Sequence, residues 1–203
     1  MELITDAILK YISENNAIDG TDNDVVAFYK YGIEITLSSL FNIVVILILS
    51  LLFNGMIEGF IFLAVLIPTR QFTGGFHADT YLKCNLVFGL SYIITLHLFR
   101  YTCNMVNVYI SILLLAVELF FVSVVCPINN EHKPIHERKQ YVRSKIISVV
   151  LYLFFGLIGL YFIFISNLYG NMIFYSLHLI TVLGILGILK ERRKENEKAK
   201  QSS

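Results

Sequence analysis

The feature that most constrains the fold is the length of two stretches that carry no charged side chain. Residues 35–57 and residues 146–189 contain no Asp, Glu, Lys or Arg. A bilayer core is about 30 Å thick, and a helix needs about 20 apolar residues to cross it. Because the backbone finds no water there, each crossing segment has to close its own hydrogen bonds as a helix. The sequence therefore predicts an all-α, polytopic, membrane-embedded helical bundle.

The rest of the composition agrees with a membrane protein. Charged residues make up 15% of the 203 positions and the mean hydropathy is +0.68, whereas a soluble domain carries about 25% charged residues. We read six hydrophobic segments, at about 35–53, 57–69, 85–99, 107–126, 146–166 and 171–189. No segment is large and polar enough to fold alone, so we expect one domain over 1–203, with the lipid bilayer as a partner. Basic residues do not alternate with exposed aromatics as on a nucleic-acid surface, so no nucleic-acid partner is expected.

The N-terminal region, 1–34, has a pattern of its own. It lacks the basic start and the unbroken apolar core of a signal peptide. Its apolar residues follow helical spacing: Leu3, Ile4, Ala7, Ile8, Tyr11 and Ile12. This pattern predicts an amphipathic helix that lies on the membrane or packs against the bundle. A capping-box pattern at residues 21–24 predicts a second helix that runs directly into the first span.

The charge distribution predicts the topology. Five of the 16 Lys and Arg lie in 127–145 and six more lie in the charged tail, 190–203. Since basic loops near span ends stay cytoplasmic, both segments are expected inside. Counting spans backward then places both termini and the stretch 70–84 on the cytoplasmic side.

The predicted topology depends on whether the second hydrophobic segment, 57–69, crosses the membrane. Only 11 residues separate Glu58 from Arg70, which is about 16 Å of helix. We favour a short span in which these two charged side chains reach the opposite membrane surfaces. A re-entrant segment is the alternative, and it would move the N-terminus and the stretch 70–84 outside.

The stretch "RQFTGGFHADTYLKC", residues 70–84, carries the side chains with the most chemical capacity. A Cys thiolate can attack a carbonyl, and a nearby imidazole can generate that thiolate. His77 and Cys84 are seven residues apart, so one straight helix would separate them by about 10.5 Å of rise. Hydrogen-bond reach is about 3 Å. A straight helix through both residues therefore cannot form a dyad.

The same stretch contains the means of a different geometry. Gly74 and Gly75 permit a tight turn with positive φ, and Asp79 is a suitable N-cap for a helix that starts at residue 80. His77 would then precede the helix and reach Cys84 in its second turn. The amides of the two glycines and of the helix start would hold an oxyanion, and Asp79 would alternatively orient the imidazole. The competing interpretation is an ordinary loop, with Cys84 as a small apolar residue at the start of a span.

Two other groups of polar residues invite a functional interpretation. Cys126, Glu131, His132 and His136 resemble zinc ligands, but Pro134 would break a helix between the two histidines and no fourth ligand is evident. We therefore expect a solvated basic loop, and neither a metal nor a cofactor.

The second group lies inside the spans. Glu118 and His178 are near the middle of their segments and His97 is near the outer end of the third. An ionisable residue at bilayer depth often marks a proton or ion path. A membrane transporter or exporter that uses Glu118 and these histidines is thus the alternative function. The structural interpretation is a neutral Glu118 that is hydrogen-bonded to a neighbouring helix.

The motif in residues 70–84 resembles the accessory gene regulator protein B (AgrB) family of bacterial membrane endopeptidases in quorum sensing. The resemblance covers nearly the full length and is carried by Arg70, Gly74, Gly75, His77, Ala78, Thr80 and Cys84 between apolar spans. It implies that Cys84 is the nucleophile and His77 the general base. Arg70 and Gly75 match motif positions beside them.

The resemblance also implies a substrate and a reaction. The expected substrate is an amphipathic propeptide of the AgrD type, cleaved at the cytoplasmic face of the bacterial cell membrane through an acyl-thioester on Cys84. A Cys or Ser of the substrate then attacks the thioester and closes a thiolactone or lactone ring. Members of this family are thought to act as homodimers and to help move the product outward.

Overall fold

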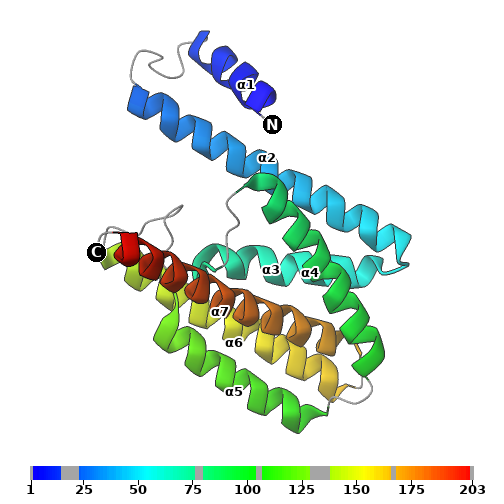
Figure 1. Cartoon of the computed structure of the whole chain (residues 1–203). Coiled ribbons are helices and arrows are strands. Elements are labelled where there is room, and N and C mark those ends of the chain that lie inside the picture. The colour runs from blue at the N-terminus through cyan, green and yellow to red at the C-terminus, as the bar shows by residue number, and fades with distance from the viewer. Residues whose placement is uncertain are drawn as a thin grey trace. The chain divides into compact units, whose positions relative to one another are not determined.

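In the computed structural model, the described residues are 2–14, 23–75, 80–103, 107–128, 138–165 and 168–201. Every regular element within these ranges is a helix (Figure 1), which confirms the all-α prediction. The helices are α1 (Glu2–Glu14), α2 (Asn23–Leu52), α3 (Met56–Thr73), α4 (Tyr81–Thr102), α5 (Val108–Val125), α6 (Arg138–Phe164) and α7 (Tyr169–Gln201). The chain divides into two compact units, Met1–Val45 and Ile46–Ser203.

The first unit contains α1 and most of α2. The predicted N-terminal helix is present, and of the α1 side chains whose burial is described, Thr5 and Leu9 are buried. Tyr11 is exposed although the spacing placed it on the apolar face. An ion pair of 2.9 Å between Asp6 and Lys30 links α1 to α2. As predicted, α2 runs without a break into the first span, while residues 21 and 22 lie outside the described part of the chain.

Six helices in the described ranges are long and apolar enough to cross a membrane, in agreement with the six predicted segments. Their apolar parts are Gly32–Leu52, Met56–Thr73, Leu82–Thr102, Val108–Val125, Arg138–Phe164 and Tyr169–Lys194. The last two helices both extend beyond the uncharged run 146–189, since α6 begins at Arg138 and α7 ends at Gln201. Because charged residues at a helix end extend into the headgroup region, α6 begins in the basic segment and α7 continues into the charged tail.

The doubtful second segment forms one continuous helix. α3 has 18 residues, with Glu58 in its first turn and Arg70 in its last. Its length is about 27 Å at 1.5 Å per residue. The polar residues at its two ends therefore bring the short apolar run up to a length that can cross a membrane, as the favoured interpretation required.

Within the second unit, α7 is the central helix. It contacts α3, α4, α5 and α6. Half of the residues in its most apolar stretch are buried, against 22% of those in α5 and in α6. Among the described residues of this unit, fully buried large side chains come from the end of α2 and from each of α3 to α7, and they include Ile46, Phe62, Leu66, Tyr92, Leu96, Val122, Tyr152, Phe174 and Leu177. The core of the unit thus forms around α7.

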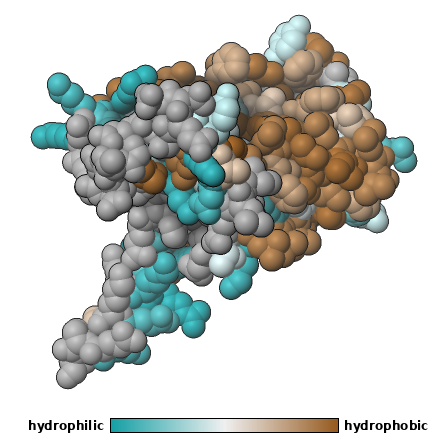
Figure 2. All heavy atoms as spheres, turned by 90° about the horizontal axis from the view of Figure 1, so that it is seen from above, coloured by the Kyte–Doolittle hydropathy of each residue, from teal (hydrophilic) through white to brown (hydrophobic). Residues whose placement is uncertain are grey.

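Large apolar side chains also cover the outside of the helices. On α4 they form a stripe at every fourth residue, in which each side chain is 57–70% exposed: Leu82, Leu86, Leu90 and Ile94. In Figure 2 such residues form a broad brown surface. Monomeric soluble proteins rarely expose contiguous apolar patches of more than a few hundred Å². The surface therefore fits a multi-pass protein that faces lipid.

The direction of the helices brings three segments to one end of the second unit. α6 and α7 are antiparallel, since the hydroxyl of Tyr152 donates to the carbonyl of Leu177 while a Cβ on Gly170 would lie 2.6 Å from the carbonyl oxygen of Gly159. The basic start of α6 is thus beside the basic end of α7. The end of α3 lies there as well, because Gly75 is next to Gly184 of α7.

Candidate functional site

The candidate site begins where α3 stops. Gly74 has φ +72° and Gly75 has φ +134°, values that glycine adopts at no steric cost. The amide of Gly74 donates to the carbonyl of Arg70 over 3.1 Å and caps the helix. The chain therefore turns at the two glycines, as predicted, and no continuous helix joins residue 72 to residue 84.

Two other segments fix this turn in place. The amide of Ile128, just beyond α5, donates to the carbonyl of Thr73 over 2.9 Å. A Cβ on Gly74 would lie 2.6 Å from the carbonyl oxygen of Ile128, and one on Gly75 would lie 3.6 Å from the carbonyl oxygen of Leu183. The turn thus rests on the segment that follows α5 and on α7, with no room for a side chain at Gly74.

The next helix begins one residue later than predicted. Thr80 has an extended backbone and its hydroxyl accepts from the amide of Lys83 over 3.3 Å, so Thr80 is the N-cap and α4 starts at Tyr81. The prediction of Asp79 as the N-cap was wrong, because the Thr80 side chain already binds the orphan amide that a cap serves. Asp79 itself lies outside the described residues.

Cys84 is the fourth residue of α4. Its amide donates to the carbonyl of Thr80 over 3.0 Å, and its free thiol is partly buried. Arg70 is partly buried, and its guanidinium interacts electrostatically with Cys84. The first turn of a helix also carries partial positive charge from its amides. Cys84 is thus near the N-terminal end of α4 and under the electrostatic influence of Arg70.

The structure does not confirm two further parts of the predicted site, the pairing of His77 with Cys84 and the oxyanion contact of the Gly74 amide. His77 lies outside the described residues, so its pairing with Cys84 stays a prediction. The amide of Gly74 was expected to bind an oxyanion, but it donates to the carbonyl of Arg70. In this arrangement the amide caps α3, and its hydrogen is already engaged in that bond.

The other two cysteines lie in different surroundings from Cys84. Cys103 and Cys126 are buried. Burial raises the pKa of the Cys126 thiol to about 12, and the charge of Lys145 offsets only part of that effect. Among the described residues no group of three or more His, Cys, Asp or Glu is placed to hold a metal ion. The remaining candidates for the zinc interpretation, residues 131–136, lie outside the described ranges.

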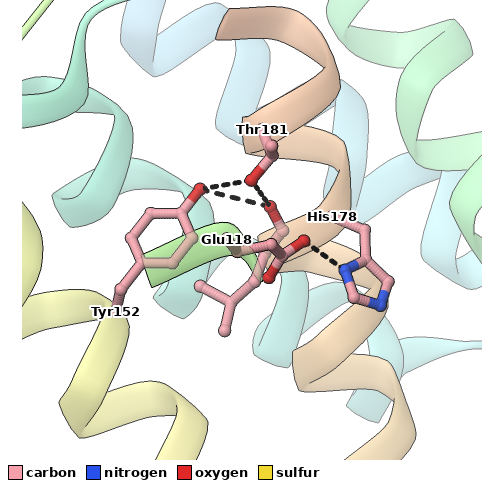
Figure 3. A network of polar contacts seen from close by, with 5 residues as sticks. Glu118, Tyr152, His178 and Thr181 are labelled. Atoms are coloured by element: carbon pink, nitrogen blue, oxygen red, sulfur yellow. Dashed lines mark hydrogen bonds and ion pairs between the residues drawn. The ribbon is translucent and has the colours of Figure 1, made fainter. Parts of the chain in front are cut away.

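A second polar cluster lies inside the bundle (Figure 3). A carboxylate oxygen of Glu118 on α5 contacts Nδ1 of His178 on α7. Beside this pair, the hydroxyl of Tyr152 on α6 lies 3.0 Å from the hydroxyl of Thr181. His97 is not part of the cluster, because its Nδ1 lies 2.9 Å from the carbonyl oxygen of Ile93 in its own helix.

Sequence reasoning named these ionisable residues and missed the pairing of two of them. Glu118 and His178 are 60 residues apart, and no spacing rule links two separate helices. The available signal was depth, since both residues are near the middle of their hydrophobic segments. The interpretation of Glu118 as hydrogen-bonded to a neighbouring helix agrees with the structure.

Comparison with known proteins identifies the family of this chain. The family model "Accessory gene regulator B" (AgrB) matches residues 5–186. The chain belongs to the AgrB family. The match includes the Gly74–Gly75 turn, Cys84, Glu118 and His178, and it ends within α7. No solved structure matches the chain.

Relatives of this AgrB-family chain come from two bacterial genera. It is 27% identical over 185 residues to a putative AgrB-like protein of Clostridium perfringens strain SM101, covering 87% of this chain and 85% of the relative. A putative AgrB-like protein 2 of C. perfringens strain 13 is 27% identical over 147 residues, which is 68% of this chain and 69% of the relative. Protein FsrB of Enterococcus faecalis is 39% identical over 84 residues, which is 41% of this chain and 34% of FsrB.

Proposed function

We propose that the chain is a membrane-embedded cysteine endopeptidase that processes an AgrD-type propeptide for bacterial quorum sensing. The observation that carries the proposal is the position of Cys84 near the N-terminus of α4, in electrostatic interaction with Arg70 and following a turn fixed by two glycines. Membership in the AgrB family and the names of the relatives support the quorum-sensing role.

The chemistry follows from a thiolate in that position. Cys84 attacks the peptide bond at the C-terminal boundary of the signal sequence, with His77 as the general base that takes the thiol proton. The C-terminal fragment leaves as an amine, and the remainder stays bound as an acyl-thioester. The positive charge of Arg70 and the N-terminus of α4 stabilise the negative charge that develops on the carbonyl oxygen.

Ring closure is the second half of the reaction. A Cys or Ser side chain in the bound peptide attacks the thioester and displaces Cys84. For a cysteine this step exchanges one thioester for another, so it needs no ATP. Restricted access of water to the acyl-enzyme favours cyclisation over hydrolysis. A site at the membrane surface supplies that restriction.

The side of the membrane is part of the proposal. The end of α3, the basic start of α6 and the basic end of α7 lie at one end of the same unit. Because basic segments stay inside, this end is cytoplasmic, as are both termini. The partners are the propeptide and, by family resemblance, a second copy of the chain.

The experiment is incubation of the purified protein with a candidate propeptide, followed by mass spectrometry of the protein and of the peptide. The expected result is an acyl adduct on Cys84, and loss of both adduct and cleavage in Cys84→Ala and His77→Ala. Cys103→Ala is the matched control, since it removes a buried free thiol at the other end of α4. Cleavage that survives Cys84→Ala would refute the proposal.

A second candidate function, transport, is favoured by one observation, the contact between Glu118 and His178 within the spans. A transporter that moves protons through this pair needs an ionisable acid, so Glu118→Gln would abolish its activity. The same variant would leave an endopeptidase at Cys84 active. The two functions are therefore separated by a single substitution.

A further inference from the structure

Glu118 on α5 is a buried carboxyl, and its partner His178 on α7 is partly exposed. Glu118 is 5% exposed, and only one of its carboxylate oxygens has a hydrogen-bond partner in the described part of the chain. Apolar residues in place of a buried ion pair are often neutral or stabilising. A buried polar contact of this kind can instead specify one arrangement of the helices that carry it.

This pair joins α5 and α7. The Gly74–Gly75 turn contacts α7 itself and Ile128, which follows α5. Glu118 is on α5, which leads to Ile128, and His178 is on α7, which carries Gly184. Gly184 is six positions after His178, which is about 9 Å along the helix. The pair therefore lies within two helical turns of the place where the turn rests.

Contacts continue from the pair to the turn. A Cβ on Gly184 would lie 3.1 Å from the side chain of Ile128 and 3.5 Å from the ring of Phe121, one turn beyond Glu118 on α5. Ile128 in turn donates its amide to Thr73 and blocks the space at Gly74. A shift of α5 along α7 would thus move the groups that hold the turn.

We propose that Glu118 and His178 are positioning residues, which fix α5 against α7 and thereby hold the Gly74–Gly75 turn in its place before the segment that leads to Cys84. The inference rests on the proposed function for its effect on cleavage, and on geometry alone for its effect on the turn. The polar link required is a hydrogen bond, which a Gln at position 118 also provides. An ionisable carboxyl is not required.

The test compares three variants of the full chain in lipid nanodiscs. The double variant Glu118→Leu with His178→Leu removes both partners and leaves no buried group unpaired, so it retains the fold. Glu118→Gln keeps the hydrogen bond. Asn171→Leu is the matched control, because it removes a buried 2.7 Å contact from the same helix to the carbonyl of Cys103, at the end remote from the turn.

Two measurements are made on each variant: kcat and KM for propeptide cleavage, and hydrogen exchange of the Ile128 amide. For the double variant we expect a kcat lower by about tenfold or more, because small displacements of reacting groups have effects of that size. We also expect a KM within about twofold of the original and faster exchange at Ile128. Glu118→Gln and Asn171→Leu should keep kcat within about threefold and leave the exchange unchanged.

Three results would overturn the inference. They are an unchanged Ile128 exchange in the double variant, an equal effect in Asn171→Leu, and a loss in Glu118→Gln as large as in the double variant. If the unmodified protein does not cleave the propeptide, the proposed function fails and the exchange measurement alone decides. Faster exchange then supports the positioning role, and unchanged exchange refutes it.

Discussion

The amide of Ile128 donates a hydrogen bond of 2.9 Å to the carbonyl of Thr73 and so joins the segment after α5 to the last residue of α3. Directly after Thr73, the chain turns at a glycine whose missing side chain leaves room for the Ile128 carbonyl. The end of a membrane helix and a distant loop are thus fixed to each other by backbone groups. The consequences of this contact can be measured by substitution.

Gly74→Ala is expected to destabilise the protein by about 1–3 kcal/mol, the usual cost of a strained backbone position. The strain has two sources, the φ of +72° and a Cβ that would lie 2.6 Å from the Ile128 carbonyl oxygen. The measurement is the thermal midpoint of unfolding in detergent. Gly32→Ala is the control, because a Cβ there meets nothing within 4 Å. Equal midpoints for the two variants would contradict this account.

The fold was largely predictable because its cause is local in the sequence. Runs without charge predicted the spans, and the capping-box pattern at residues 21–24 predicted a helix that continues into the first span, as α2 does. The ends of the helices were less predictable. α6 begins in the basic segment rather than after it, because charged side chains at a membrane surface are compatible with a helix.

Only those features of the candidate site that depend on a single segment of the sequence were predictable. Gly74 and Gly75 predicted the turn, since positive φ is a property of the residue itself. The contact of Ile128 with Thr73 and that of Glu118 with His178 join segments that are far apart in the chain. No periodicity encodes such pairs. Thr80 replaced Asp79 as the N-cap because adjacent residues that are both good caps compete, and backbone geometry decides between them.

Arg70 is expected to act through its charge. Arg70→Gln should lower kcat for cleavage by about 10²-fold, the usual effect of removing one group that stabilises an oxyanion. Arg70→Lys should retain more of the activity, because it keeps the positive charge near Cys84. The measurement is initial-rate kinetics on the propeptide.

Arg100→Gln is the matched control for this charge. Arg100 also lies near a helix end and donates to the backbone carbonyls of Phe53 and Asn54, but at the other end of α4. It should keep the cleavage rate of the unmodified protein. Equal losses in Arg100→Gln and Arg70→Gln would show that the effect is not local to Cys84.

The three cysteines should differ in their reaction with an alkylating reagent at about pH 8. Only a thiolate reacts, and burial raises the pKa of Cys126 from 9.0 to about 12. A raised pKa means a smaller thiolate fraction, so Cys126 should react at least about a hundredfold more slowly than a thiol of ordinary pKa. Cys84 is the partly exposed thiol and should be modified first.

Peptide mapping by mass spectrometry measures that order. Denaturation in detergent provides the control, since all three cysteines should then react at similar rates. Modification of Cys126 before Cys84 in the folded protein would contradict the burial of Cys126.

Two glycines at helix contacts should respond differently to the same substitution. A Cβ on Gly170 would lie 2.6 Å from the carbonyl oxygen of Gly159 and 2.8 Å from the amide nitrogen of Ile163, both of which belong to the backbone of α6. A Cβ on Gly156 would meet the methyl carbons of Leu115 at 2.6 and 2.7 Å. A leucine side chain can rotate, whereas two packed helices have to separate. Gly170→Ala should therefore destabilise the protein by about 1–3 kcal/mol, the cost of overpacking, and Gly156→Ala by less.

Thermal midpoints in detergent measure this difference, and kcat for cleavage provides a second reading. Gly170 is near the start of α7, remote from the Gly74–Gly75 turn, so Gly170→Ala should lower the midpoint while kcat at low temperature stays unchanged. A lower midpoint for Gly156→Ala than for Gly170→Ala would mean that Leu115 cannot move. The contact of α5 with α6 would then be the less adaptable of the two.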